Sequence, residues 1–163
     1  MKFLMNHLNQ FKFILSLFLL YLCFNTFCIM QTYLGLGSNL GKKEHNIDFA
    51  IQQIAEKVGK VIRRSTYYYS APVGFSSDNL FVNAVILIET QLAPLELLHQ
   101  LQDIEVKMGR TEKTKEGVYK DRIIDIDILL YGDMTVDLPE LKIPHPLMHE
   151  RDFVMIPLRE IQY

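Results

Sequence analysis

Apolar residues along the chain follow two different periods, which predict a mixed α and β fold. Apolar and small or polar positions alternate over residues 31–37, and this short alternating run predicts a strand. Over residues 42–58 the apolar positions recur every three or four residues, as on one face of an amphipathic helix, and Gly59 follows as a stop signal. A second helix is predicted from Pro94 to about Met108, because proline is favoured in the first turn of a helix.

Three further segments have the composition of strands. Residues 61–69 and 81–90 are rich in β-branched and aromatic side chains, and residues 123–131 form the most apolar strand. The Pro-, Gly- and Ser-containing stretch 70–78 predicts a loop. A short helix is expected over 152–161, at the end of the chain.

The order of these elements predicts the fold class. Strand, helix, strand, strand, helix, strand is the βαββαβ order of ferredoxin-like α+β domains, with an antiparallel sheet and helices packed on one face. The charged stretch 110–121 predicts an irregular, mobile loop. Pro139, Pro144 and Pro146 predict a mostly extended segment over 139–148, since each proline fixes its backbone φ.

The first 29 residues differ from the remainder and divide the chain at Met30. The run 13–29 is apolar and about as long as a bilayer crossing requires, and Lys2 and Lys12 precede it. An uncleaved signal-anchor is therefore one interpretation, with a single membrane anchor ahead of a cytoplasmic domain. The alternative is that translation begins at Met30, so that residues 1–29 are upstream sequence and the protein is the domain 30–163.

Composition narrows the function classes. The chain of 163 residues is 49% apolar, which is enough for one folded domain with its own core. A net charge of −2 lacks the basic footprint of nucleic-acid binding, so no nucleic-acid partner is expected. Both cysteines, Cys23 and Cys28, lie in the N-terminal run, which excludes a disulfide scaffold or a cysteine zinc site in the domain.

Two carboxylates on the last strand are the sharpest chemical feature. Successive side chains of a strand face opposite sides, so Asp125 and Asp127 share one face and Ile124, Ile126 and Ile128 the other. The two carboxylates are about 7 Å apart along the strand and suit hard cations such as Mg²⁺, which shares its oxygen ligands with substrate phosphates. An ordinary polar strand face is the alternative, although strands are depleted in aspartate.

Basic, aromatic and amide side chains supply two further candidate groups. Arginine forks match phosphate oxygens, and the basic candidates are Arg110, Arg122, His145 and Arg151, each with a solvated or structural role as the alternative. Aromatic side chains stack on a flat heterocyclic ligand, and an amide side chain forms hydrogen bonds with its edge. The candidates for these roles are Phe81, Asn83, Tyr119 and Phe153, with core packing as the alternative for the phenylalanines. The glycines of 35–41 match neither G-x-G-x-x-G nor a P-loop.

Seven segments together resemble the 6-hydroxymethyl-7,8-dihydropterin pyrophosphokinase family, over residues 33–161. They are LGLGSNLG at 34–41, APVGF at 71–75, FVNAV at 81–85, IEVKMGR at 104–110, DRIIDIDILLYG at 121–132, IPHP at 143–146 and RDFVMIPLREI at 151–161. The resemblance implies a ferredoxin-like enzyme that transfers diphosphate from ATP, as co-substrate, to the hydroxymethyl group of the pterin and releases AMP in folate biosynthesis.

The resemblance also implies a role for individual residues. Asp125 and Asp127 would bind two Mg²⁺ ions, and Arg110 and Arg122 would be catalytic. ATP-binding positions by motif match are Gln102, Glu105, Arg110, Arg122, Ile128, Leu141, Lys142, His145 and Arg151. Pterin-binding positions are Ser70, Val73, Phe81, Asn83, Tyr119 and Phe153.

The chain departs from the family pattern after Arg110. Family members commonly carry a second arginine there and a tryptophan before the next arginine, for which Tyr119 and Lys113 or Lys115 are the candidate replacements. This departure, with the N-terminal run, keeps an inactive paralogue open as an alternative; a ferredoxin-like ligand-binding module is a separate alternative from another class.

Overall fold

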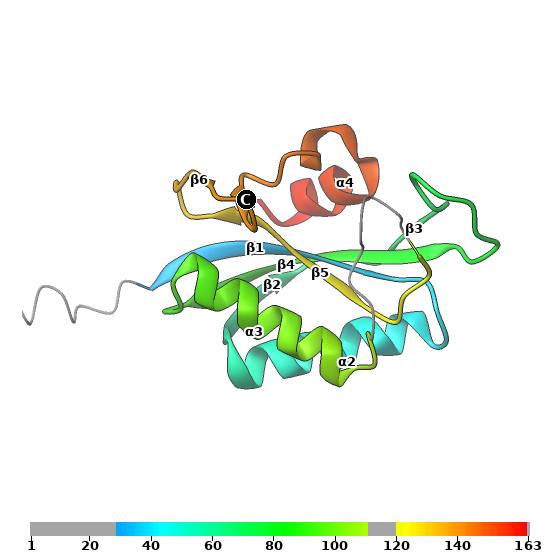
Figure 1. The fold of residues 1–163 in the computed structure, drawn as a ribbon, viewed down its shortest axis with the longest axis horizontal. Helices are drawn as coiled ribbons and strands as arrows, with labels where there is room; N and C mark the ends of the chain where they lie inside the picture. The colour runs from blue at the N-terminus through cyan, green and yellow to red at the C-terminus, as the bar shows by residue number, and fades with distance from the viewer. Residues whose placement is uncertain (1–28, 111–119, 163) are drawn as a thin grey trace, which may run out of the picture.

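A five-stranded sheet with helices on both faces forms the domain in the computed structural model, which describes residues 29–110 and 120–162 (Figure 1). The elements that carry the fold are β1 (Met30–Ser38), α2 (Lys43–Lys57), β2 (Gly59–Arg64), β3 (Tyr68–Ser70), β4 (Phe81–Thr90), α3 (Pro94–Lys107), β5 (Asp125–Tyr131) and α4 (Asp152–Ile161). Between β5 and α4 lie β6 (Val136–Asp137), β7 (Lys142–Ile143) and the 3-10 helix η1 (Met148–Glu150).

The strand order is β2-β4-β1-β5, with β3 paired to β4 beyond this path. All of these pairs are antiparallel, and β1 lies between β4 and β5 along most of its length. The predicted α+β class, the βαββαβ order and the antiparallel sheet are therefore confirmed. β7 pairs with β6 in a small separate sheet. β7 lies within the stretch 139–148 that is predicted to be mostly extended.

The single strand predicted over 61–69 is instead broken into β2 and β3. The reason is local hydrogen bonding at Ser65, whose Oγ accepts the backbone N–H of Val85 at 2.9 Å and takes over a position in the ladder. The next backbone N–H, of Thr66, donates to the carboxylate of Glu160 in α4. The backbone N–H of Ser65 still donates to the carbonyl of Val85 at 2.9 Å, but side chains occupy the positions that the backbone would otherwise take at this point of the ladder.

The helices do not all lie on one face of the sheet, which differs from the prediction. Figure 1 shows α2 and α3 on one side and α4 on the other. The apolar residues of α4 explain its position, because Val154, Leu158 and Ile161 pack with Val85 and Leu129 in a second buried cluster. The main core lies between the sheet and α2 and α3.

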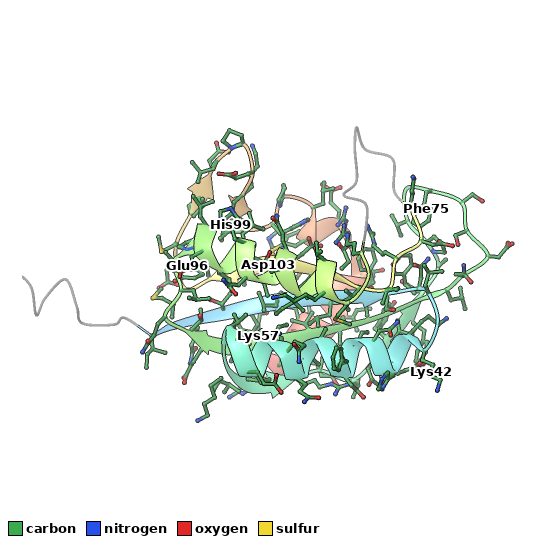
Figure 2. The ribbon with its side chains drawn as sticks, turned by 60° about the horizontal axis from the view of Figure 1, so that its bottom comes forward. Lys42, Lys57, Phe75, Glu96, His99 and Asp103 are labelled. Atoms are coloured by element: carbon green, nitrogen blue, oxygen red, sulfur yellow. The ribbon has the colours of Figure 1, made fainter. Side chains whose placement is uncertain are left out.

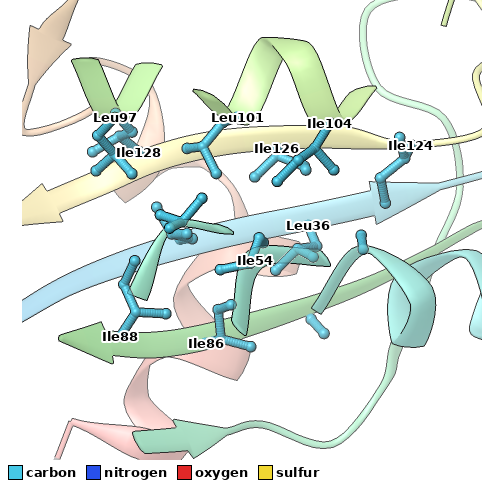
Figure 3. Close-up of a cluster of buried hydrophobic side chains, with 14 of the residues drawn as sticks. Leu36, Ile54, Ile86, Ile88, Leu97, Leu101, Ile104, Ile124, Ile126 and Ile128 are labelled. Carbon is cyan, nitrogen blue, oxygen red and sulfur yellow. The ribbon is translucent and has the colours of Figure 1, made fainter. Parts of the chain in front are cut away.

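Alternation along β5 assigns its two faces. Figure 3 shows Leu97, Leu101 and Ile104 of α3 directed toward Ile126 and its neighbours on β5. Because strand side chains alternate, the two aspartates between these isoleucines face the side of the sheet that α4 covers. The burial of the aliphatic face thus fixes where the carboxylates lie.

The outer surface of α3 is polar, as expected for an amphipathic helix. Figure 2 shows Glu96, His99 and Asp103 along this helix, and all three are exposed. Within residues 29–110 and 120–162, no helix is both long enough and apolar enough to cross a membrane. Most of the predicted N-terminal anchor, up to residue 28, and residues 111–119 of the loop predicted over 110–121 lie outside the described residues.

We expect Leu101→Ala to lower the free energy of unfolding by about 2–5 kcal/mol, because Leu101 is fully buried between α3 and the sheet and its loss leaves a cavity. Val106→Ala on the same helix is the matched control, since Val106 is 61% exposed and should change stability by less than about 0.5 kcal/mol. Urea unfolding of both variants measures the difference; equal destabilisation would contradict the assigned core.

Candidate active site

A cavity of about 260 Å³ lies on the face of the sheet that α4 covers. This volume is close to the lower end of the roughly 300–1,000 Å³ typical of small-molecule pockets, enough for a heterocycle but not for a whole nucleotide as well. Its walls come from β1, β4, β5, α4 and the loops that follow β3 and precede η1. Apolar and charged side chains both contribute to the lining.

Two glycines of β1 form the floor of this cavity. Gly35 pairs with Val85 and Asp127, and Gly37 pairs with Asn83 and Asp125, so both occupy the face that carries the carboxylates. A Cβ on Gly37 would lie 3.1 Å from Oδ1 of Asn83, while a Cβ on Gly35 would meet only the side chain of Leu129, at 3.3 Å. The absence of side chains on the central strand therefore leaves the room that a ligand needs.

The carboxylates of Asp125 and Asp127 are compensated to different degrees. Asp125 forms an ion pair with the guanidinium of Arg110 and lies 3.3 Å from that of Arg122. Among the described residues, the carboxylate of Asp127 forms no hydrogen bond or ion pair. Burial, with Asp125 and Glu105 nearby, raises the pKa of Asp127 to about 7.

The carboxylate of Glu105 in α3 binds the guanidinium of Arg110 from outside the cavity. Its Oε1 accepts the backbone N–H of Ile126 at 2.7 Å and an N–H of Arg110 at 2.5 Å. Burial raises the pKa of Glu105 to about 7, although Arg110 opposes the shift. Glu105 itself does not line the cavity, but Arg110, which it binds, does.

The opposite end of the cavity is aromatic and amide in character. Asn83 donates its Nδ2 hydrogens to Oγ of Ser70 at 3.0 Å and to the carbonyl of Tyr68 at 3.3 Å. This arrangement leaves its Oδ1 directed over Gly37. The ring of Phe81 has the guanidinium of Arg122 over it, with Cζ 5.6 Å from the ring centroid. Arg122 therefore lies between this aromatic end and Asp125.

His145 and Arg151 close the charged end. The backbone N–H of Leu147 donates to Nδ1 of His145 at 3.3 Å, so the neutral ring carries its proton on Nε2. Burial lowers the pKa of His145, and the nearby charge of Arg151 lowers it further. The guanidinium of Arg151 lies over Phe153, with Cζ 5.7 Å from the ring centroid. A neutral imidazole donor and three arginines thus face the same cavity as the two carboxylates.

The structure brings most of the sequence-predicted site residues together. The cavity lining includes Ser70, Val73, Phe81, Asn83, Arg110, Arg122, Asp125, Asp127, His145, Arg151 and Phe153. Among the other candidates, Ile128 and Leu141 are buried in the core on the α2 and α3 side of the sheet. Lys142 is exposed and pairs with Asp137 at 2.9 Å, and Gln102 lies on α3 away from the lining. Tyr119 lies outside the described residues.

Several lining residues were not assigned a role from sequence: Gly35, Gly37, Phe75, Leu129, Leu147 and Val154. The alternation of Leu34 and Leu36 with the two glycines was a usable signal, because it places both glycines on one strand face. Phe75 packs edge-on to Phe81, with ring centroids 6.2 Å apart. No local pattern in its loop marks that contact.

The donor set at the charged end fits a hard divalent cation. Two carboxylates face one cavity, and burial together with the neighbouring carboxylates raises the pKa of Asp127. Within the described part of the chain, no group of three or more His, Cys, Asp or Glu side chains is placed to hold a metal. Mg²⁺ is commonly bound by only one or two carboxylates, with water and substrate phosphates completing its shell.

The family model and the curated relatives that match this chain point to the same family. Residues 33–163 match the family model described as 7,8-dihydro-6-hydroxymethylpterin-pyrophosphokinase (HPPK). A 2-amino-4-hydroxy-6-hydroxymethyldihydropteridine pyrophosphokinase of Porphyromonas gingivalis is 45% identical over 130 residues, covering 79% of this chain and 88% of the relative. That of Haemophilus influenzae is 40% identical over 134 residues, covering 82% of each chain.

Solved structures match at the level of the fold. The wild-type HPPK-DHPS of Plasmodium falciparum with SDX-DHP has a TM-score of 0.65 at 17% sequence identity and covers 81% of this chain. An HPPK-DHPS in complex with substrates has a TM-score of 0.63 at 15% identity and covers 82% of this chain. The chain spans about 40% of the length of these solved chains.

The buried carboxyl of Glu105 should make the free energy of unfolding depend on pH. Its pKa is raised from 4.5 to about 7, so the folded protein retains a proton that the unfolded chain releases. Stability should therefore fall as the pH rises from about 4.5 to about 7, by at most about 3 kcal/mol from this group. In Glu105→Gln, which can still accept the N–H of Ile126, this fall should be smaller.

Urea unfolding of both proteins across this pH range, with a chelator present, measures the effect. Glu96→Gln on the exposed surface of the same helix is the control and should follow the wild type. Parallel curves for wild type and Glu105→Gln would contradict the assigned pKa.

Proposed function

The chain belongs to the 7,8-dihydro-6-hydroxymethylpterin-pyrophosphokinase family, enzymes that transfer pyrophosphate to hydroxymethyldihydropterin in folate synthesis, and we propose that its transfer takes place in the cavity on the α4 side of the sheet. The observation that carries this assignment is the division of the cavity into two ends. An amide and aromatic end adjoins an end with two carboxylates and three arginines. These ends match the two substrates, a flat heterocycle and a polyphosphate.

The pterin occupies the amide and aromatic end in this proposal. Gly37 leaves space for a flat ring on the sheet, and Asn83 offers Oδ1 to a ring N–H at its edge. Phe81 and Phe153 supply ring faces, and Ser70 and Val73 complete the wall. Ser70 also holds the Asn83 amide in the orientation that keeps Oδ1 toward the ring.

The diphosphate to be transferred lies at the charged end in this proposal. The family is Mg²⁺–ATP dependent, and Asp125 and Asp127 are the side chains that would hold two Mg²⁺ ions, which when bound neutralise charge on the polyphosphate. Arg110, Arg122 and Arg151 donate to phosphate oxygens as planar forks. His145 donates through Nε2 without adding a full charge.

The reaction needs alignment more than proton chemistry. The hydroxymethyl oxygen of the pterin attacks the β-phosphorus of ATP, the bond from that phosphorus to the bridging oxygen next to the α-phosphate breaks, AMP leaves, and the hydroxyl proton passes to solvent. Arg122 lies between the ring of Phe81 and Asp125, so it can stabilise charge where the two substrates meet. None of the described lining residues is positioned as an obvious general base, and positioning with electrostatic stabilisation accounts for catalysis in this class of reaction.

The remaining ATP-site candidates enter the proposal through other contacts. Ile128 and Leu141 are buried in the core, so a nucleotide can reach only their backbone groups. Gln102 and Lys142 lie beyond the cavity lining, where the adenosine part of ATP extends out of the small cavity. Tyr119 stays a prediction for the pterin side.

The catalytic unit in this proposal is residues 30–163. Pairing within the sheet begins at Met30, which faces Thr90 in β4, and the family match covers 33–163. Both interpretations of the N-terminal run, a membrane anchor and upstream sequence, stay open. The intact mass of the native protein distinguishes them, because translation from Met30 removes residues 1–29.

Replacing Asp127 with Ala should lower kcat by about 100-fold or more, because a ligand to the metal-bound polyphosphate is lost. Purified full-length protein is given ATP, Mg²⁺ and 6-hydroxymethyl-7,8-dihydropterin, and AMP is measured by chromatography. Asp133→Ala, in the exposed turn after β5, removes the same charge as a control and should keep wild-type turnover.

Two results would count against the proposal. Absence of AMP from the wild-type protein would favour an inactive paralogue or a ligand-binding module. Normal turnover by Asp127→Ala at limiting Mg²⁺ would remove this carboxylate from the metal site.

Replacing Gly37 with Ala should raise the KM for the pterin by about tenfold, because the new methyl group lies 3.1 Å from Oδ1 of Asn83 in the ring site. The KM for ATP should change much less. Gly35→Ala is the matched comparison, since its methyl group meets only the flexible Leu129 side chain and should have a smaller effect on the pterin. Steady-state kinetics with each substrate varied in turn measures both constants. Equal effects on ATP and pterin would contradict the placement of the pterin.

A further inference from the structure

A hydrogen-bonded cluster outside the cavity joins three segments that are far apart in sequence. The carboxylate of Asp121 accepts from Nδ2 of Asn39 through Oδ1 and from Nδ2 of Asn79 through Oδ2, both at 2.7 Å. Asn39 follows β1, Asn79 lies in the loop before β4, and Asp121 lies four residues before β5. Hydrogen bonds from Ser77, Asn79 and Asn39 lower the pKa of Asp121, so it accepts as a carboxylate at neutral pH.

Asn39 extends this cluster onto the backbone of Arg122. Its side-chain Oδ1 accepts the backbone N–H of Arg122 at 2.8 Å, and its own backbone N–H donates to the carbonyl of Arg122 at 3.1 Å. Asn39 is only 1% exposed, so these bonds are shielded from competing water. The main chain of Arg122 is therefore held at both its N–H and its carbonyl.

The position of the Arg122 main chain matters because of where its side chain reaches. Its guanidinium lies over the ring of Phe81 and 3.3 Å from Asp125. Phe81 begins β4 two residues after Asn79, so the hydrogen bond that Asn79 donates to Asp121 holds the segment that carries Phe81. A second hydrogen bond holds Asn39, which holds Arg122. The cluster thus fixes both partners of the contact between arginine and ring.

We propose that Asp121 is a positioning residue for the transfer reaction, which sets the Arg122 guanidinium relative to the pterin end of the cavity through Asn39 and Asn79. This inference rests on the proposed function of the cavity. A carboxylate suits the role because it accepts from two amide side chains at once, whereas an alanine accepts from neither. Displacement of a catalytic group by about 1 Å can lower a rate about 100-fold, so a contact outside the cavity can affect turnover.

The test separates the two branches of the cluster. Asp121→Ala removes both branches, and we expect kcat to fall by about 10- to 100-fold and the KM for the pterin to rise. Asn79→Ala removes only the branch to the loop before β4, so the KM for the pterin should rise with a smaller change in kcat. Asp78→Ala is the control in the same loop; it removes one exposed charge, forms no bond to Asp121 and should behave as the wild type.

A double-mutant cycle measures the coupling between Asp121 and Asn79, which general loss of folding would not produce. Asp121→Ala and Asn79→Ala remove the same hydrogen bond, so their effects on the pterin KM should be smaller in combination than the product of the single effects. Urea unfolding and ATP affinity by calorimetry are measured on each variant. A variant that unfolds is replaced by Asp121→Asn, which keeps one acceptor oxygen and should give an intermediate loss in kcat.

The outcomes are distinct from those for the function itself. An inactive wild-type protein refutes the proposed function. An active wild type with unchanged kcat and pterin KM in folded Asp121→Ala overturns the positioning role, as does full multiplicativity in the cycle.

Discussion

Concentrated negative charge at one face of β5 is the constraint around which the cavity is organised. Asp125 and Asp127 are adjacent on that face, and Glu105 approaches from α3 on the other side of the strand. Arg110 binds both Glu105 and Asp125, while Asp127 has no such partner among the described residues. Like charges in a partly buried site favour either protonation or a cation. Burial, Asp125 and Glu105 raise the pKa of Asp127, although Arg122 and Arg151 oppose the shift.

The alternation of strand side chains explains why so much of this site was predictable. Ile124, Ile126 and Ile128 must be buried together, and that requirement alone sends the two aspartates to the opposite face. The same reasoning applies to β1, where the leucines enter the core and the glycines face the cavity. Sequence reasoning identified the first pattern and gave no role to the second. A missing side chain is a weaker signal than a charged one, although both follow from the same period.

Features set by long-range contacts could not be predicted in this way. The break between β2 and β3 depends on Ser65 accepting a hydrogen bond from Val85 and on Glu160 meeting Thr66, contacts that join distant parts of the chain. The face chosen by α4 depends on apolar residues of β4 and β5 that its own sequence does not reveal. Local periodicity predicts which elements form, while side-chain contacts between elements determine how they are placed.

Glu105 illustrates how a residue outside the cavity supports chemistry inside it. An arginine that leaves a carboxylate partner to bind a phosphate loses its orientation unless another group still holds it. Arg110 has two carboxylate partners, and the one in α3 is anchored to the backbone N–H of Ile126. If a metal-bound polyphosphate takes the place of Arg110 at Asp125, the bond to Glu105 remains and keeps the guanidinium at the edge of the cavity. Glu105 is thus a buried acid whose raised pKa costs stability at neutral pH and whose carboxylate holds the arginine beside it.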